Sequence, residues 1–168
     1  MKKQNGFSLI ELLIVVAIIL IIAAIAIPNL MRSKMAANEA SAVGSVRTIN
    51  TAEVTYSSSW GIGYAVDLPS LGASSAGACT ATSTNACLID NILTSGTKSG
   101  YTFVAAGTLP NSGINNGFEV NATPVTVGQT GQRAFCSDQS GVIRFNTSGT
   151  AIGTAAGNCA AVSTVLGN

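Results

Sequence analysis

The sequence has no histidine and few charged residues, and both shortages narrow what the protein can do. Charged residues make up 9% of the 168 residues, whereas a typical soluble domain has about 25%. Without histidine, the chain lacks the commonest general base and the commonest protein metal ligand. A net charge of +1 offers little attraction for nucleic acid across the whole chain. We therefore expect a non-enzymatic protein with no catalytic residues, no cofactor and no bound metal.

A long apolar run, residues 7–27, dominates the N-terminal part of the chain. A bilayer core needs roughly 20 apolar helical residues, so this run predicts a membrane-spanning helix over residues 7–28. Glu11 is its only charged residue, and a carboxylate inside such a helix costs about 2.5–3.5 kcal/mol. A positive charge on a neighbouring copy of the same helix would offset that cost. Glu11 therefore indicates assembly.

The segment before the apolar run is short and polar. An ordinary secretory signal is cleaved after its apolar region, but here Gly6 stands directly before the run. A cut between Gly6 and Phe7 would remove residues 1–6 as a leader peptide and leave the apolar helix on the mature protein. We expect processing at this position.

Four cysteines all follow the apolar run, at Cys79, Cys87, Cys136 and Cys159. An even number of cysteines beside a membrane-targeting segment favours two disulfides, and four cysteines allow three connectivities. We expect nearest-neighbour pairing, Cys79–Cys87 and Cys136–Cys159, with free thiols in a reducing compartment as the alternative. Lys and Arg flank the apolar run on both sides and leave its orientation open. The cysteines therefore place the C-terminal part outside the cytoplasm.

The N-terminal residues resemble the motif of type IV pilins and pseudopilins. The resemblance rests on Gly6-Phe7-Ser8-Leu9-Ile10-Glu11, on the apolar residues that follow, and on the closing Ala24-Ile25-Ala26-Ile27-Pro28. It implies cleavage by prepilin peptidase between Gly6 and Phe7 and N-methylation of the new Phe7 amine. Glu11 then becomes the fifth residue of the mature chain, where this family carries its glutamate.

The physics of Glu11 agrees with this resemblance. The Phe7 amine of an incoming subunit can lie against the Glu11 carboxylate of a neighbour already in the filament. Misregistered helices would leave a buried unpaired charge, so this pairing would favour the correct axial stagger. The alternative is that Glu11 pairs with the Phe7 amine of its own chain.

Pro28 follows the apolar run directly. Proline lacks an amide donor and clashes with the carbonyl four residues earlier, so it kinks or opens a helix. An opening at Pro28 would permit axial stretch of a filament. The other interpretation is a modest bend in a continuous helix.

The remaining chain predicts an α+β fold. Residues 29–57 form the amphipathic half of one long helix, with Ala42, Val46 and Ile49 on one face and charges such as Glu39 on the polar faces. Residues 58–168 form a globular head, which begins with a connecting loop over 61–92. A small antiparallel sheet of three or four strands packs on the helix, and two disulfides staple the head. The strand candidates are residues 101–105, 117–121, 133–136 and 142–145.

Other polar residues of the head suggest weaker roles. The acids Asp67, Asp90 and Glu119 show no paired motif and are expected to be structural or solvated. Asp138 is expected to cap the turn over 137–141, with a calcium site as the alternative. Lys98, Arg133 and Arg144 offer only a small electrostatic term and leave nucleic acid binding open. Asn121 and Asn146 begin acceptor tripeptides for N-linked glycans.

Together these patterns predict the structural subunit of a type IV pilus filament. The expected partners are identical subunits in a helical homopolymer, prepilin peptidase, membrane lipid before assembly, and an inner-membrane assembly platform with its ATPase-driven machinery. The expected location is the bacterial inner membrane and then an extracellular pilus. One alternative is a pseudopilin of a type II secretion system, which forms a periplasmic pseudopilus. A membrane-anchored enzyme or binding domain is a more distant alternative.

Overall fold

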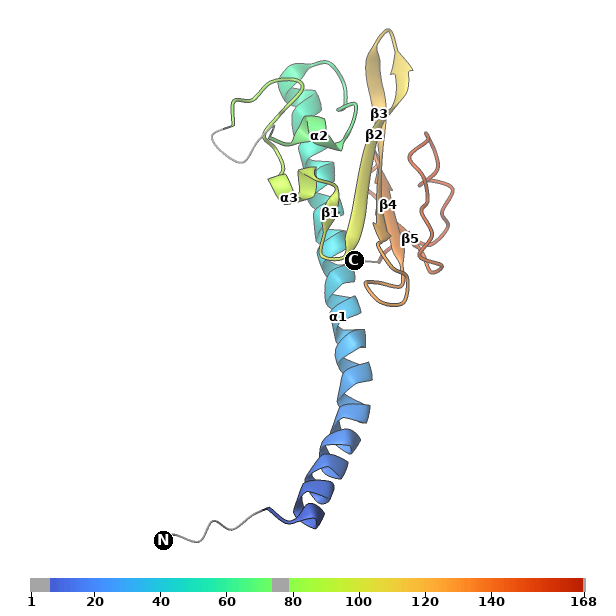
Figure 1. Cartoon of the computed structure of the whole chain (residues 1–168). Helices are drawn as coiled ribbons and strands as arrows, with labels where there is room; N and C mark the ends of the chain where they lie inside the picture. The colour runs from blue at the N-terminus through green and yellow to red at the C-terminus, as the bar shows by residue number, and fades with distance from the viewer. Residues whose placement is uncertain (1–6, 74–78, 168) are drawn as a thin grey trace. The chain divides into compact units, whose positions relative to one another are not determined.

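The computed structural model describes residues 7–73 and 79–167 of the chain (Figure 1). The chain divides into two compact units, Met1–Lys34 and Met35–Asn168. The long helix α1 (Leu9–Trp60) supplies residues to both units. Each unit is described by itself.

The described part of the first unit consists almost entirely of helix α1. Nearly every side chain from Phe7 to Lys34 is exposed, including leucines and isoleucines that are more than half exposed. This helix is long and apolar enough to cross a membrane, the only such helix among the described residues. Its apolar surface therefore has no covering within the unit.

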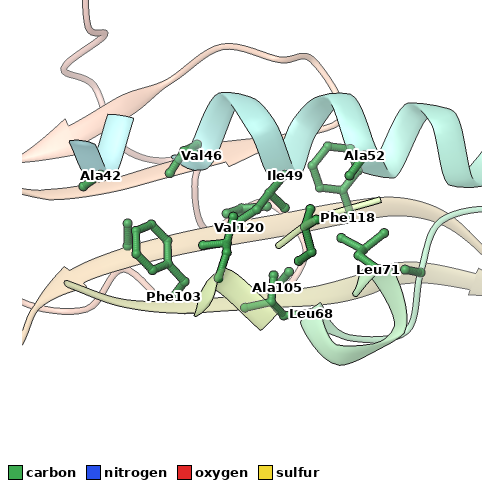
Figure 2. Packing of buried hydrophobic residues seen from close by; sticks show 14 of the residues in the cluster. Ala42, Val46, Ile49, Ala52, Leu68, Leu71, Phe103, Ala105, Phe118 and Val120 are labelled. Atoms are coloured by element: carbon green, nitrogen blue, oxygen red, sulfur yellow. The ribbon is translucent and has the colours of Figure 1, made fainter. Parts of the chain in front are cut away.

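The second unit is built around the other half of α1. Ala42, Val46, Ile49 and Ala52 recur at a spacing of three or four residues and are all buried. In Figure 2 these side chains face the sheet, where the labelled residues are Phe103, Ala105, Phe118 and Val120. An apolar face at helical spacing against a sheet is the amphipathic packing expected from the sequence.

Helix α1 continues beyond the expected end at residue 57, to Trp60. The rings of Tyr56 and Trp60 stack with centroids 5.1 Å apart, and the Ser58 hydroxyl donates to the Val54 carbonyl at 2.8 Å. These contacts hold the serine-rich turn in helical form. The helix ends where Gly61 adopts a positive φ of 64°, which glycine tolerates at a helix C-terminus.

The sheet is an antiparallel meander of five strands in the order β1-β2-β3-β4-β5. The expected three or four strands are too few because the two-residue strand β1 pairs with the start of β2 through Thr97↔Thr102. The strands are β1 (Thr97–Lys98), β2 (Tyr101–Asn111), β3 (Ile114–Pro124), β4 (Ala134–Asp138) and β5 (Arg144–Asn146).

Strands β2 and β3 are longer than the strand candidates 101–105 and 117–121, because the turn between them is short. Pro110 pairs with Asn115, and the Asn116 Nδ2 donates to the Leu109 carbonyl at 3.2 Å. The reversal shrinks to Ser112 and Gly113, whose φ angles are 52° and 81°. Two successive positive φ angles suit a two-residue hairpin turn, so the strands extend almost to the tip.

The expected loop over 61–92 contains two short helices in its described part. They are α2 (Leu68–Leu71) and α3 (Asn91–Thr94). Asp67 caps α2 by accepting from the Ser70 amide at 3.0 Å, and Asp90 caps α3 by accepting from the Leu93 amide at 2.8 Å. Both acids therefore have structural roles.

Two disulfides staple the second unit, Cys79–Cys87 and Cys136–Cys159. These are the nearest-neighbour pairs. The second disulfide joins strand β4 to the segment that follows β5, which also lies against β5 through the bridge between Arg144 and Val165. The fold is thus the expected α+β arrangement of helix, antiparallel sheet and disulfides.

Candidate assembly site

Glu11 lies in the first turn of α1 and stabilises the start of that helix. Its Oε2 accepts a hydrogen bond from the Ser8 backbone amide at 2.9 Å, and the Ser8 carbonyl accepts from the Leu12 amide at 3.2 Å. Ser8 is therefore the N-cap, and Glu11 supplies the acidic half of a capping box. A carboxylate here also interacts favourably with the positive end of the helix dipole.

This capping role was missing from the sequence interpretation, although the sequence carries a signal for it. Ser8-Leu9-Ile10-Glu11 has the S-x-x-E spacing of a capping box. Glu11 binds the Ser8 amide through one oxygen only, so the other oxygen can accept a cation from outside the chain. Capping within one copy and pairing between copies are therefore compatible.

The surroundings of Glu11 are apolar and uncovered. Leu9, Ile10, Leu12 and Leu13 are each more than half exposed. Among the described residues, no lysine or arginine forms an ion pair with Glu11. The site is thus a lone carboxylate on an exposed apolar helix, and it can recruit an apolar partner that brings a positive charge.

Of the two residues at the expected cleavage site, the structure describes only Phe7. Gly6 lies outside the described residues. Phe7 precedes α1 and is 82% exposed. The segment at Phe7 is therefore accessible to an enzyme that acts on it.

Pro28 lies inside α1, which continues through it without a break. Proline has no backbone N–H, so the Ala24 carbonyl four residues earlier lacks its helical donor. Opening of the helix at this position, with axial stretch, stays a prediction.

Comparisons with known proteins show what this N-terminal segment is similar to. A family model described as the prokaryotic N-terminal methylation motif matches residues 1–27. The type IV wide pilus major component PilA4 of Thermus thermophilus is 56% identical over 39 residues, 23% of this chain and 30% of that protein. The N-terminal segment of this chain is therefore similar to the N-terminal segments of type IV pilins.

A second pilin gives a similar result. The type IV major pilin protein PilA of Myxococcus xanthus is 43% identical over 54 residues, 32% of this chain and 24% of that protein. The matches thus cover less than a third of either relative's length. No solved structure matches the chain significantly. The family model covers only the N-terminal segment, and each pilin match covers less than a third of this chain. The pilin family is one of structural, non-enzymatic proteins.

The second unit of the chain, called the head from here on, contains buried carboxylates that the sequence did not reveal. Glu39, expected on a polar face, is only 8% exposed. Its Oε1 accepts from the backbone amides of Gln132 and Arg133 at 2.9 and 3.1 Å, and its Oε2 pairs with the Arg133 guanidinium at 2.7 Å. Glu39 thereby binds α1 to the segment before β4.

Glu53 is completely buried beside the start of the loop that follows α1. Its Oε2 accepts from the Ala65 amide at 2.9 Å, whereas its Oε1 has no hydrogen-bond partner among the described residues. Burial raises the pKa of Glu53 to about 7, and the Ala65 hydrogen bond opposes this only in part. Glu53 is therefore the acid of the head most sensitive to pH near neutrality.

Glu119 binds the C-terminal segment to the sheet. It accepts from the Gly157 amide at 2.7 Å and from the Cys159 amide at 3.1 Å. Burial raises the pKa of Glu119, and these two hydrogen bonds act against the rise. Each of the three buried glutamates thus binds a different chain segment, which is a structural role.

The other candidate residues of the head are structural as well. Asp138 caps the β4–β5 turn as predicted, since its Oδ1 accepts from the Ser140 amide at 2.8 Å. The described residues contain no group of three or more potential metal ligands, so nothing supports a calcium site at Asp138.

Asn121 is only 5% exposed and is paired on both sides within the sheet, which blocks glycosylation. Asn146 uses its amide nitrogen to bind the Thr150 carbonyl at 2.8 Å.

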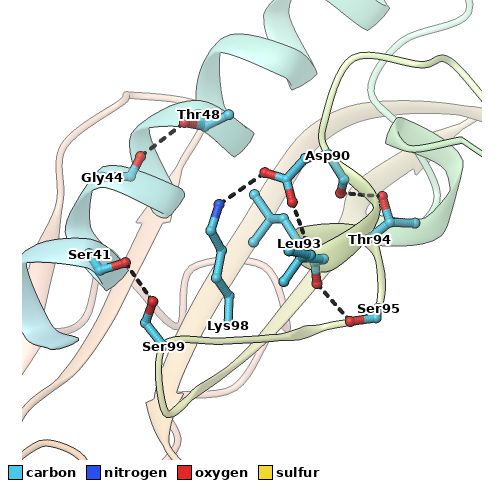
Figure 3. Close-up of polar contacts among 10 residues, drawn as sticks. Ser41, Gly44, Thr48, Asp90, Leu93, Thr94, Ser95, Lys98 and Ser99 are labelled. Carbon is cyan, nitrogen blue, oxygen red and sulfur yellow. Dashed lines mark hydrogen bonds and ion pairs between the residues drawn. The ribbon is translucent and has the colours of Figure 1, made fainter. Parts of the chain in front are cut away.

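The three cations considered for nucleic acid binding do not form one patch. Lys98 on β1 pairs with Asp90 at 2.9 Å (Figure 3), and Arg133 pairs with Glu39. Arg144 lies on β5, at the opposite edge of the sheet from β1. The three cations therefore do not share one surface, and nucleic acid binding stays open.

Proposed function

We propose that the chain is a structural subunit of a type IV pilus filament. The leader is removed between Gly6 and Phe7, the new Phe7 amine is methylated, and the processed subunit waits in the inner membrane before joining a helical fibre. The observation that carries the proposal is the lone Glu11 carboxylate on an exposed apolar helix. The similarity of the N-terminal segment to those of type IV pilins supports it.

Assembly follows from two features of α1, its exposed apolar side chains and the charge of Glu11. Packing α1 against copies of itself removes the leucine and isoleucine side chains from water or lipid. The Phe7 amine of an incoming subunit then meets the Glu11 oxygen that the Ser8 amide leaves free. A helix that stops one turn too early leaves both charges unpaired in apolar surroundings, which costs several kcal/mol per ion. The pair therefore selects the axial register.

Processing and transport require partners of known classes. A prepilin peptidase cuts the leader and methylates Phe7, lipid holds the helix before assembly, and an ATPase-driven platform in the inner membrane extracts it. The finished fibre is extracellular, and motility, adhesion or DNA uptake follow from the fibre and its motor. Pairing of the cysteines in the head is consistent with an oxidising location outside the cytoplasm.

The proposal is tested by replacing Glu11 with alanine in cells that express the full chain. We expect mass spectrometry to find the processed, methylated chain in the membrane, but no fibres in the sheared fraction. Leu12→Ala is the matched control, because it truncates the adjacent side chain without removing a charge, and fibres should persist. Normal fibres from Glu11→Ala cells would contradict the assembly role of Glu11.

The second candidate function is that of a pseudopilin of a type II secretion system. The same α1 features support it, because both filament types would pack this helix. Deleting the chain distinguishes the two. Loss of surface fibres with normal protein secretion supports the pilus. Loss of secretion, with fibres seen only on overproduction, supports the pseudopilus.

A further inference from the structure

The second unit satisfies almost all of its charges internally. Four of its acids are buried, namely Glu39, Glu53, Glu119 and Asp138. Among the described residues, Arg133 forms an ion pair with Glu39 and Lys98 forms one with Asp90. The Arg144 Nη1 donates to the Val162 carbonyl at 3.0 Å. Arg47 and Asp67 remain exposed and form no ion pair among the described residues. They are one charge of each sign.

The Arg47 side chain lies where two hollows of the surface adjoin. Hollows of about 390 and 400 Å³ share Arg47, Leu166 and Gly167 as lining residues. The first extends along the β4–β5 connection, and the second extends along α1 toward Ala36. Much of the remaining lining is apolar, including Val43, Val142, Ile143 and Val165. Together the hollows form one groove, the Arg47 groove. Its lining mixes polar and apolar residues, and it includes the paired Glu39 and Arg133 beside the unpaired Arg47.

Asp67 has the complementary character. Its Oδ1 caps α2 by accepting from the Ser70 amide and hydroxyl at 3.0 and 2.6 Å. Its Oδ2 has no hydrogen-bond partner among the described residues. Val66 beside it is 69% exposed, and Pro69 is exposed as well. Asp67 is thus an exposed carboxylate between two exposed apolar residues, a surface segment called the Asp67 projection. It matches a groove that offers one unpaired cation and several apolar side chains.

These two charges cannot meet within one copy. Asp67 forms a bridge with Ala106 on the β1 side of β2, whereas the Arg47 groove is lined by the segments around β5. Strands lie about 4.8 Å apart, so the strand spacings between β2 and β5 separate the two sites by roughly 14 Å or more. In Figure 1, α2 and β5 lie on opposite sides of the head. Ion pairing therefore requires a second molecule.

We propose that the Arg47 groove of one copy receives the Asp67 projection of the next copy, so that the two edges of the head form a lateral contact in the filament. Such a contact is heterologous, because each copy offers a different surface to each of its two neighbours. A heterologous contact leaves a free groove and a free projection at the ends, so it propagates into an open helical polymer. This inference rests on the proposed function and adds a head contact to the helix contact at Glu11.

A double-mutant cycle in the full chain tests the contact. Arg47→Glu sets two like charges against each other, and we expect the sheared fibre fraction to fall about fivefold or more. Asp67→Asn keeps an oxygen to cap α2 but removes the charge, and should reduce fibres less. In the Asp67→Asn background, Arg47→Glu should cause little further loss, because its repelling partner is gone.

Two controls exclude indirect effects. Thr48→Glu adds a negative charge at the next exposed helix position, outside the groove lining, and should leave fibre yield near the wild-type level. Thermal unfolding of the head should be the same for Arg47→Glu and the wild type. Equal loss from Arg47→Glu with and without Asp67, or no loss at all, overturns the inference while wild-type fibres still support the proposed function. Absence of fibres from the wild-type chain overturns both.

Discussion

The two units of this chain treat their apolar side chains and their charges in opposite ways. In the first unit, residues 7–34 expose nearly every apolar side chain and leave Glu11 without an ion-pair partner among the described residues. In the second unit, apolar side chains such as Ile49 and Phe118 are buried, and the three buried glutamates accept hydrogen bonds from backbone amides of distant segments. The first unit therefore leaves its apolar side chains and its charge uncovered, whereas the head is stabilised by contacts within itself.

This difference predicts which property of the protein a substitution in each unit should change. Changes in the head should alter the free energy of unfolding of a single chain. Changes in residues 7–34 should alter membrane insertion and assembly, with little effect on the head. Four predictions test that division, from the largest expected effect on the head to the smallest.

Phe118→Ala should cause the largest loss. The Phe118 ring is only 1% exposed and contacts Tyr64 at a centroid distance of 4.9 Å. Removing such a side chain costs about 3–5 kcal/mol, because the cavity left behind collapses only in part. Thermal unfolding of the detergent-solubilised chain, followed by near-UV circular dichroism, would measure the loss. Ile18→Ala, in the first unit, is the control and should change the head by less than about 0.5 kcal/mol.

Replacing Cys136 and Cys159 by serine should destabilise the head next most strongly. This disulfide closes 23 residues, whereas Cys79–Cys87 closes 8. The chain-entropy model gives about 3.4 kcal/mol for the longer loop and about 2.5 kcal/mol for the shorter one. Denaturant unfolding of the two double variants should rank them in that order. The reverse order would mean that native-state contacts, such as those of Glu119, outweigh loop entropy.

Glu53 should make the head less stable as the pH rises from about 4.5 to about 7. Its folded pKa of about 7 lies above the ordinary glutamate value of 4.5, so the protonated form favours folding. Below pH 4.5 both states carry the proton and this stability is fully present, but it is lost as the pH rises through the folded pKa. The loss at pH 7.5 should be on the order of 3 kcal/mol.

The matched variant for this pH effect is Glu53→Gln, which keeps an oxygen for the Ala65 amide but cannot ionise. Its melting temperature should vary less between pH 5 and pH 7.5 than that of the wild type, and it should be the more stable protein at pH 7.5. Glu119 has a raised pKa and Asp90 a lowered one, so some pH dependence should remain. An unchanged pH profile in Glu53→Gln would show that another group causes it.

Lys98→Ala should have the smallest effect. Lys98 pairs with Asp90 at the surface, with side-chain exposures of 31% and 50%, and exposed pairs are worth about 0–1 kcal/mol. Asp90 keeps its hydrogen bond from the Leu93 amide, so the cap of α3 survives. The melting temperature should fall slightly at low salt and not at all at high salt. A large loss at both salt concentrations would indicate a packing role for the lysine stem.

Much of this chain was predictable because its signals are local. The apolar run, the Gly6–Glu11 motif and the i, i+4, i+7 spacing of Ala42, Val46 and Ile49 are all readable along the sequence. The turn capped by Asp138 was predictable too, because its contacts span only a few residues. Both helix periodicity and turn chemistry depend on near neighbours.

Tertiary structure decided the rest, because the partners involved are distant in sequence. Glu39, Glu53 and Glu119 accept hydrogen bonds from residues 93, 12 and 38 positions away, respectively, so composition alone suggests solvated acids. Strand β1 exists only because β2 lies beside it. The sequence by itself determined the apolar character of residues 7–27 and the position of their one charge, because both are read directly along the chain. The fold determined which charges of the head are buried and bound within it, because their partners are distant in sequence.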